Sequence, residues 1–434
     1  MLVMLLFSLS VNAAEPSISS PASSLGRLVE VAEQNSPTIR KFQLALDQAQ
    51  LEVKSARAKF LPSLDLESKL AAKGFDPASR DAKNKRYDSV LALKLTETFY
   101  DNGESVTKYK AAINALELKR LEFEIERDNQ LLKLAGTFYD WSAKWQNRQI
   151  SNNKADLLRR QFNILEAQYK QGIKTKRDVL RIETEVRRLQ IDLLRADNEL
   201  EVVLQRLASQ AGVDVEGLKT AKISADEAKA DAPIPMGPWS EVKIENHRRS
   251  KIFARQSEEA QLQSRLKERN YWPQIALTGE LSGNDSGGET PRPFMTTDYW
   301  GWAAMVSLKY NIWDWGTRNR DLQIARVNER KVQAGNEQAR LDLGIELHEV
   351  WLKLREFAES VKMTKELLVI EQQSFNILEA EYRNGRATYL DLITNLNSLI
   401  DARSKYASTY FDLKKQQTIY AFHKGTLHED LKPK

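Results

Sequence analysis

The chain has 434 residues, no cysteine and four histidines, and its 65 basic side chains are nearly balanced by 60 acidic ones, for a formal net charge of +5. The absence of cysteine excludes disulfides, thiolate metal sites, cysteine nucleophiles and a lipidated N-terminal cysteine. Acidic residues are interleaved with the basic ones, so the charge does not favour nucleic acid as a partner. The low counts of glycine (18) and proline (12) favour long regular elements.

The N-terminus carries a short apolar segment, Leu2 to Val11, followed by Asn12 and two alanines. About ten residues are too few to cross a bilayer as a helix. The segment is typical of the apolar part of a secretory signal and predicts a signal peptide over residues 1–13; the alternative is a frayed N-terminus. No later stretch reaches the roughly 18 apolar residues of a transmembrane helix, so an exported, membrane-embedded chain would have to use strands.

Two proline-free stretches, from about Glu104 to Gln168 and from about Arg318 to Glu381, predict helices roughly 97 Å long. Shorter helices are predicted over residues 25–59 and 175–210, and from residues 238 and 388 onward. In each half the two shorter helices together match the long one in length. We therefore expect two short helices to stack end to end beside each long helix.

Alternating segments lie between these helices, at about 61–73, 88–98, 272–283 and 300–312. In the first, Leu64 and Leu66 fall on one face, and Asp65 and Glu67 fall on the other. A period of two over about ten residues predicts strands. One apolar and one polar face is typical of strands with lipid on one side and water on the other. The alternative is a small soluble sheet with one buried face.

Tryptophan is concentrated in and beside the last two predicted strands. Such side chains are typical of the interface between membrane and water, which predicts a membrane girdle. The five residues are Trp272, Trp300, Trp302, Trp313 and Trp315.

The chain contains an internal repeat. Residues 161–180 (QFNILEAQYKQGIKTKRDVL) and 374–393 (SFNILEAEYRNGRATYLDLI) are identical at ten of twenty positions, with an offset of 213. This predicts a tandem duplication. The expected divisions are a first repeat over 14–213, a linker or equatorial region over 214–238, a second repeat over 239–423 and a tail over 424–434.

Four strands per chain cannot close a membrane barrel, and open sheet edges are not tolerated in lipid. The strands would therefore be pooled between chains. Three chains would supply 12 strands and 12 helical columns. The sequence thus predicts a mainly α fold with a small β membrane part, assembled as a homotrimer.

The repeated segments share the pattern Tyr-x-x-Gly-x-x-Thr-x-x-Asp, from Tyr169 to Asp178 and from Tyr382 to Asp391. With the duplication and the order helix, strand pair, long helix, helix, this pattern resembles the TolC family of outer-membrane efflux and secretion channels. The resemblance covers nearly the whole mature chain. It implies a 12-stranded β-barrel joined to a long α-helical coiled-coil barrel, in the outer membrane of a Gram-negative bacterium and extending into the periplasm.

The resemblance implies a passive exit duct of a tripartite efflux pump or a type I secretion system. Its partners would be a periplasmic adaptor (membrane fusion protein), an inner-membrane pump of the RND or ABC type, and outer-membrane lipid, with no nucleic acid and no cofactor. The sequence does not support an enzymatic function, because it has no phosphate-binding glycine loop, no Gly-x-Ser-x-Gly motif and no histidines at the spacing of a metal site. The alternative is an elongated periplasmic coiled-coil scaffold without a pore.

The tip pattern has a structural interpretation of its own. Glycine permits the tight reversal between two long helices, and threonine is a preferred residue to cap the returning helix. A carboxylate three residues later satisfies free N–H groups in the first turn. The residues concerned are Gly172, Thr175 and Asp178 in the first repeat and Gly385, Thr388 and Asp391 in the second.

By resemblance, the second tip would also line a periplasmic aperture. Asp391 matches an acidic ring position, whereas Thr394 stands where a second acid is expected. Tyr382 matches the tyrosine of the family's restraint network, and Arg386 lies one position away from the expected arginine. Both tips are candidates for docking an adaptor, the alternative being solvated turns. The docking candidates are Gln171, Gly172, Ile173, Thr175, Asp178, Asn384, Gly385 and Thr388.

Overall fold

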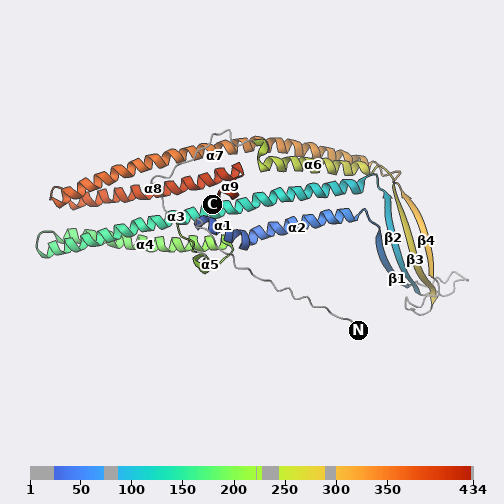
Figure 1. Cartoon of the computed structure of the whole chain (residues 1–434), viewed down its shortest axis with the longest axis horizontal. Coiled ribbons are helices and arrows are strands. Elements are labelled where there is room, and N and C mark those ends of the chain that lie inside the picture. Colours follow the sequence, from blue (N-terminus) through green and yellow to red (C-terminus); the bar gives the residue numbers. More distant parts are fainter. Residues whose placement is uncertain (1–23, 73–86, 221, 227–243, 289–299, 432–434) are drawn as a thin grey trace.

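The computed structural model describes residues 24–72, 87–220, 222–226, 244–288 and 300–431. These residues form an elongated body of helices with a sheet at one end (Figure 1). The expected signal peptide over 1–13 lies outside the described residues, as does most of the expected linker.

The first half of the described chain runs from helix to strand pair and back to helix. Its elements are α1 (Ser24–Asn35), α2 (Pro37–Ala58), β1 (Ser63–Ala72), β2 (Tyr87–Tyr100), α3 (Glu104–Lys170), α4 (Lys176–Ala211) and α5 (Val215–Thr220).

The second half repeats this order. Its elements are the 3₁₀ turn η2 (Ile244–Asn246), α6 (Arg248–Arg269), β3 (Gln274–Gly288), β4 (Trp300–Lys309), α7 (Thr317–Arg383), α8 (Tyr389–Lys424) and α9 (Leu427–Leu431).

The long helices agree with the sequence prediction to within two residues, and each of α3 and α7 has 67 residues. At 1.5 Å per residue each is roughly 100 Å long. Helix α3 contacts both α2 and α4, and α7 contacts both α6 and α8. Figure 1 shows that each pair of shorter helices lies end to end beside its long helix, as expected.

Four predicted boundaries are wrong. The single helix expected over 25–59 is divided at Ser36, whose ψ of 118° is extended, because proline at position 37 disfavours a helical residue before it. The helix expected from residue 238 begins at Arg248, after the η2 turn, and residues 238–243 lie outside the described part. The third strand extends to Gly288 rather than to residue 283, and the last strand ends at Lys309 rather than at residue 312.

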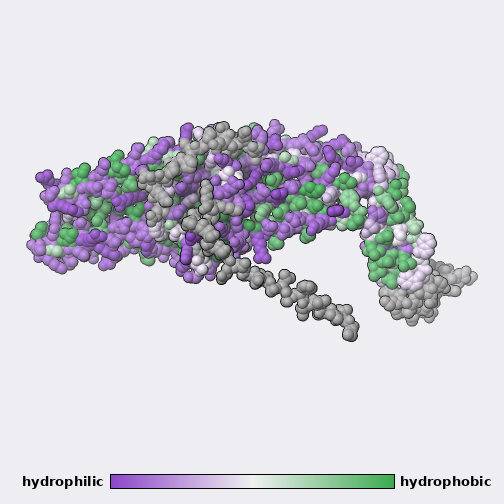
Figure 2. Space-filling model, viewed as in Figure 1, coloured by the Kyte–Doolittle hydropathy of each residue, from purple (hydrophilic) through white to green (hydrophobic). Residues whose placement is uncertain are grey.

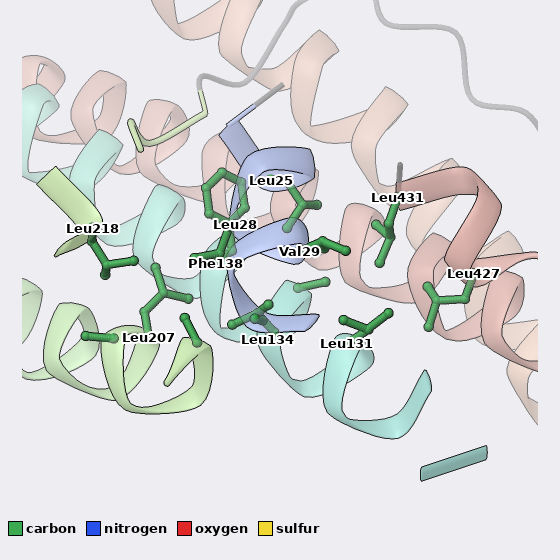
Figure 3. Packing of buried hydrophobic residues seen from close by; sticks show 14 residues of the cluster. Leu25, Leu28, Val29, Leu131, Leu134, Phe138, Leu207, Leu218, Leu427 and Leu431 are labelled. Carbon is green, nitrogen blue, oxygen red and sulfur yellow. The ribbon is translucent and has the colours of Figure 1, made fainter. Parts of the chain in front are cut away.

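Where α1 meets α4, the short helices are held by a common hydrophobic core (Figure 3). Phe138 and Leu134 of α3 lie at its centre with Leu28 of α1 and Leu207 of α4, all fully buried or nearly so. Leu427 and Leu431 bring α9 into the same core. The joint of the first repeat is therefore also the place where the end of the second repeat is anchored.

The sheet is antiparallel with the strand order β1-β2-β3-β4. Its register aligns Leu66, Leu93, Leu281 and Trp302 in one row across the four strands. Leu66 is 71% exposed and Trp302 is 82% exposed. Figure 2 shows the sheet as a mainly hydrophobic surface beside a mainly hydrophilic helical body.

Charged residues occupy the opposite face of the sheet. The ammonium of Lys94 lies 2.5 Å from the Glu67 carboxylate and 3.9 Å from that of Glu280, so one lysine links β1, β2 and β3. Strands β1 and β4 each pair with only one strand among the described residues, so each has an open edge.

Among the described residues, no helix combines the length and apolar character needed to cross a membrane.

Candidate functional site at the helix tips and the sheet

The first tip joins α3 to α4 through a tight reversal. Gly172 has φ of +75°, a left-handed conformation that costs glycine little. Its N–H donates to the carbonyl of Tyr169 at 2.9 Å, and the N–H of Ile173 donates to that of Gln168 at 2.9 Å. These bonds satisfy carbonyls at the end of α3. Ile173 stays largely exposed at the end of the turn.

The second tip, between α7 and α8, has the same geometry. Gly385 has φ of +72°, its N–H donates to the carbonyl of Tyr382 at 3.0 Å, and the N–H of Arg386 donates to that of Glu381 at 2.9 Å. Figure 1 places both turns at the same end of the molecule, opposite the sheet. The two matching turns of the duplication therefore lie at the same end of the molecule.

Each returning helix begins with a reciprocal capping box. Thr175 Oγ1 accepts from the Asp178 N–H at 3.3 Å, and Asp178 Oδ2 accepts from the Thr175 N–H at 3.2 Å. In the second tip, Thr388 Oγ1 accepts from the Asp391 N–H at 3.2 Å and Asp391 Oδ2 accepts from the Thr388 N–H at 3.1 Å. The threonine hydroxyl also donates to the carboxylate in both boxes.

The capping boxes affect the protonation of both tip carboxylates. The hydroxyl and N–H of Thr388 hold the pKa of Asp391 below its ordinary value, and those of Thr175 do the same for Asp178. The neighbouring lysine and arginine also favour ionised Asp178. Repulsion between copies of Asp391 would act in the opposite direction, but it requires neighbouring chains.

Replacing Thr388 by alanine is expected to destabilise the start of α8 by about 1 kcal/mol, because one capping acceptor is lost. The carboxylate's contribution is present above the ordinary aspartate pKa and is lost as the pH falls below about 4, since its folded-state pKa is depressed. Amide hydrogen exchange in the first turn of α8 should report both effects. Thr175→Ala is the matched control: it should accelerate exchange in α4 and leave α8 unchanged.

The aperture residues expected by resemblance do not form one network within the chain. The Tyr382 ring lies 6.4 Å from the ring of Tyr389, whereas Arg386 is exposed and has no ion pair with any described residue. Burial and the charge of Asp178 raise the pKa of Tyr382. Thr394 is exposed, and its hydroxyl donates to the Leu390 carbonyl at 2.9 Å.

Tyr389 is a tip residue that the sequence analysis missed. Its side chain is buried, and its hydroxyl has no hydrogen-bond partner among the described residues. It belongs to a core that joins both hairpins, with Leu165 of α3, Ile182 of α4 and Phe375 of α7. The repeat comparison could not identify Tyr389, because Lys176 occupies the corresponding place in the first repeat.

The five tryptophans lie at both ends of the sheet and are all largely exposed. Trp300 begins β4 at the end far from the helices, with Trp302 two residues further along the strand. Trp272, Trp313 and Trp315 fall in the connections between the sheet and the helices, where the rings of Trp313 and Trp315 are 5.7 Å apart. Two tryptophan levels separated by an apolar strand are consistent with two membrane interfaces.

Among the described residues, no group of three or more histidine, aspartate or glutamate side chains has the arrangement of a metal site. The candidate site consists of two parts at opposite ends of the molecule. One is the pair of capped turns, and the other is the sheet with one exposed apolar face.

The family model "Outer membrane efflux protein" matches residues 28–213 and 251–418. The chain belongs to the outer membrane efflux protein family. The two matched segments lie within the two expected repeats, whose outer boundaries remain predictions. Membership places this protein among outer membrane export proteins rather than enzymes.

Curated relatives agree with this assignment. The chain is 20% identical to the outer membrane protein TolC of Escherichia coli (strain K12) over 422 residues, covering 94% of this chain and 84% of TolC. The TolC of Salmonella enteritidis is 21% identical over 420 residues, covering 94% of this chain and 83% of that protein.

Solved structures show the same fold. The CmeC outer membrane channel of Campylobacter jejuni has a TM-score of 0.80 at 12% identity, covering 97% of this chain and 94% of CmeC. VceC from Vibrio cholerae has a TM-score of 0.75 at 16% identity, covering 92% of this chain and 96% of VceC. The predicted fold class, mainly α with four strands in each TolC-like chain, is thereby confirmed.

Proposed function

We propose that three copies of this efflux protein form an outer-membrane exit duct that passively conducts substrates from the periplasm and an inner-membrane pump to the exterior. The observation that carries the proposal is the sheet at the end of the helical body. Its leucine and tryptophan face is exposed, and both of its edges are open. Such a surface is unfavourable in water, and such edges are unfavourable in lipid unless further strands pair with them.

If neighbouring copies close the sheet into a barrel in the membrane, the apolar face is no longer in water and the strand edges are paired. With four strands from each of three chains, the edge of β4 pairs with β1 of the next copy. The apolar row of Leu66, Leu93, Leu281 and Trp302 then faces lipid, and the Lys94 network faces the interior. The helical body, roughly 100 Å long, continues from the sheet into the periplasm.

The tips would form the periplasmic end of the duct. Asp391 is exposed at the start of α8, and a ring of three such carboxylates favours cations. The exposed turns around Ile173 and Arg386 are the surfaces that we assign to adaptor docking. Either an RND or an ABC type of pump is compatible with these residues.

Single-channel recordings in a planar bilayer would test the proposal and the aperture together. The full-length protein, purified from outer membranes in detergent, should be a trimer that forms cation-preferring pores of low conductance. Asp391→Ala should weaken the cation preference, because a ring of negative charges is lost. It should raise the conductance about twofold or more, because the smaller alanine side chain leaves the aperture wider.

Asp178→Ala is the matched control, because it removes the equivalent capping carboxylate from the first repeat. It should leave conductance close to that of the wild type. Equal effects of the two substitutions would mean that Asp391 acts through helix capping alone. A protein that is soluble without detergent and forms no pore would refute the duct and favour a periplasmic scaffold.

A further inference from the structure

A cavity of about 190 Å³ lies where the start of α6 meets the end of α8, against α3. Among the described residues, its lining contains no acidic side chain and is dominated by basic ones. The basic lining residues are His247, Arg248, Arg249, Lys251, His423 and Lys424.

The two arginines are held in place by carboxylates of other helices. Arg248 forms an ion pair with Asp128 of α3, and its Nη2 donates to the Gly425 carbonyl at 3.4 Å. Arg249 Nη1 donates to Glu346 of α7 at 2.6 Å. Both arginines line the cavity, and neither of these carboxylates does. These ion pairs hold both guanidinium groups in place at the wall of the cavity.

Two buried histidines complete the wall. His247 is 8% exposed and His423 is 7% exposed, and their ring centroids are 5.8 Å apart. His247 caps α6, because its Nδ1 accepts from the Arg249 N–H at 3.2 Å. The Nδ1 of His423 is buried and has no partner among the described residues, and its Nε2 is 3.7 Å from Glu346. A buried polar nitrogen without a partner marks an unfilled interaction.

Charged groups of both signs surround the histidine pair, and only the basic ones line the cavity. Burial, followed by His423 and Arg249, lowers the pKa of His247 to about 4, and burial together with Arg249 lowers that of His423. The charged groups near the pair come from each packed element. They are Arg248, Arg249 and Lys251 of α6, Lys424 of α8, Glu346 of α7, Glu124 and Asp128 of α3, and Glu245 of η2.

We propose that this cavity binds one small oxyanion of the sulfate, phosphate or carboxylate class. The cavity has room for such a group, and both arginines line it. Because His247 Nδ1 accepts a hydrogen bond, its Nε2 carries the ring proton and can donate, and the unpartnered Nδ1 of His423 supplies a further donor once that ring is protonated. A bound anion would be contacted by α6 and α8 together. It would thereby strengthen the joint between the stacked helices of the second repeat.

Binding is coupled to pH with a definite sign. A bound anion stabilises imidazolium, so it raises the pKa of both histidines from their depressed values. Binding therefore takes up protons, and affinity increases as the pH falls from the raised histidine pKa values of the bound state toward the depressed ones of the free state, about 4 for His247. Sulfate is the appropriate probe, because its own charge stays constant over that range.

Isothermal titration of sulfate into the full-length protein in detergent, with chloride at matched ionic strength, tests the site. We expect saturable binding of one sulfate per chain that is tighter at about pH 5.5 than at about pH 8. Lys251→Gln should weaken binding about tenfold. His247→Asn should remove much of the pH dependence while keeping α6 capped, because asparagine is also a preferred capping residue.

Lys267→Gln is the matched control: it removes a lysine from the opposite end of the same helix, where Lys267 pairs with Asp321. This variant should bind sulfate as the wild type does. The proposal is overturned if no saturable binding is observed, or if Lys251→Gln and His247→Asn bind like the Lys267 control. Circular dichroism of each variant establishes that a loss of binding is not a loss of fold.

Discussion

Gly212→Ala is expected to destabilise the fold by about 3 kcal/mol, because the substitution combines backbone strain with a collision. Gly212 ends α4 with φ of +74°. A side-chain carbon placed there would lie 2.4 Å from the carbonyl oxygen of Asn35 and 2.9 Å from the backbone nitrogen of Ser36. Neither backbone atom can move without displacing the junction between α1 and α2.

The duplication provides a matched control for this substitution. Gly425 ends α8 in the same left-handed conformation, with φ of +82°, and lies 213 residues after Gly212. Among the described residues, no heavy atom beyond the glycine and its two chain neighbours lies within 4 Å of the position its added carbon would occupy. Gly425→Ala should therefore show only the conformational cost, about 1 kcal/mol.

The comparison requires the thermal midpoints of both variants, measured by far-ultraviolet circular dichroism in detergent. Gly212→Ala should lower the midpoint by clearly more than Gly425→Ala. Equal midpoints would show that the chain around Asn35 adjusts at little cost, and that the close approach of α4 to the α1–α2 junction contributes little to stability.

Features with a local periodic signal could be predicted from the sequence. The long helices contain no proline, and the alternating segments form strands with one apolar face. The sequence therefore located both kinds of element to within a few residues. The capping boxes depend only on Thr388 and Asp391 three residues apart, and on the matching pair in the first tip. These features follow from neighbours in the chain and need no knowledge of the fold.

Features that depend on distant segments could not be predicted in this way. The stacking of His247 on His423 joins residues from two helices, and neither residue belongs to a recognisable motif. Tyr382 contacts Tyr389 across a turn in which resemblance suggested an arginine. The ion pair between Asp128 and Arg248 joins residues 120 positions apart. Each depends on how side chains pack across a turn or between helices, which the sequence period does not specify.

Asp128→Ala is the second substitution with a large expected effect. It should lower the free energy of unfolding by about 3 kcal/mol. The Asp128 side chain is 0% exposed, and its two oxygens bind different arginines. Arg127 Nη2 donates to Oδ1 at 2.9 Å, and Arg248 of α6 forms an ion pair with Oδ2. Removing the carboxylate leaves two partly buried guanidinium groups without the one acid that binds both of them.

The loss of stability should depend on the charge of the side chain at position 128 and not only on its volume. A surface ion pair contributes little, because water solvates both partners well. Around Asp128 the arginine side chains are only 21% and 23% exposed, so water replaces the carboxylate poorly. Asp128→Asn keeps the shape and some hydrogen bonds but loses the charge. It should therefore fall between the wild type and Asp128→Ala.

Glu124→Ala is the control, because Glu124 pairs with the same arginine from a more exposed position. Its carboxylate lies 3.6 Å from Arg248 Nε and its side chain is 33% exposed, so its removal should cost less than about 1 kcal/mol. Thermal midpoints of the three variants give the ranking. If Glu124→Ala were as damaging as Asp128→Ala, the stabilisation would come from the summed charge around Arg248, and burial of Asp128 between α3 and α6 would not be the cause.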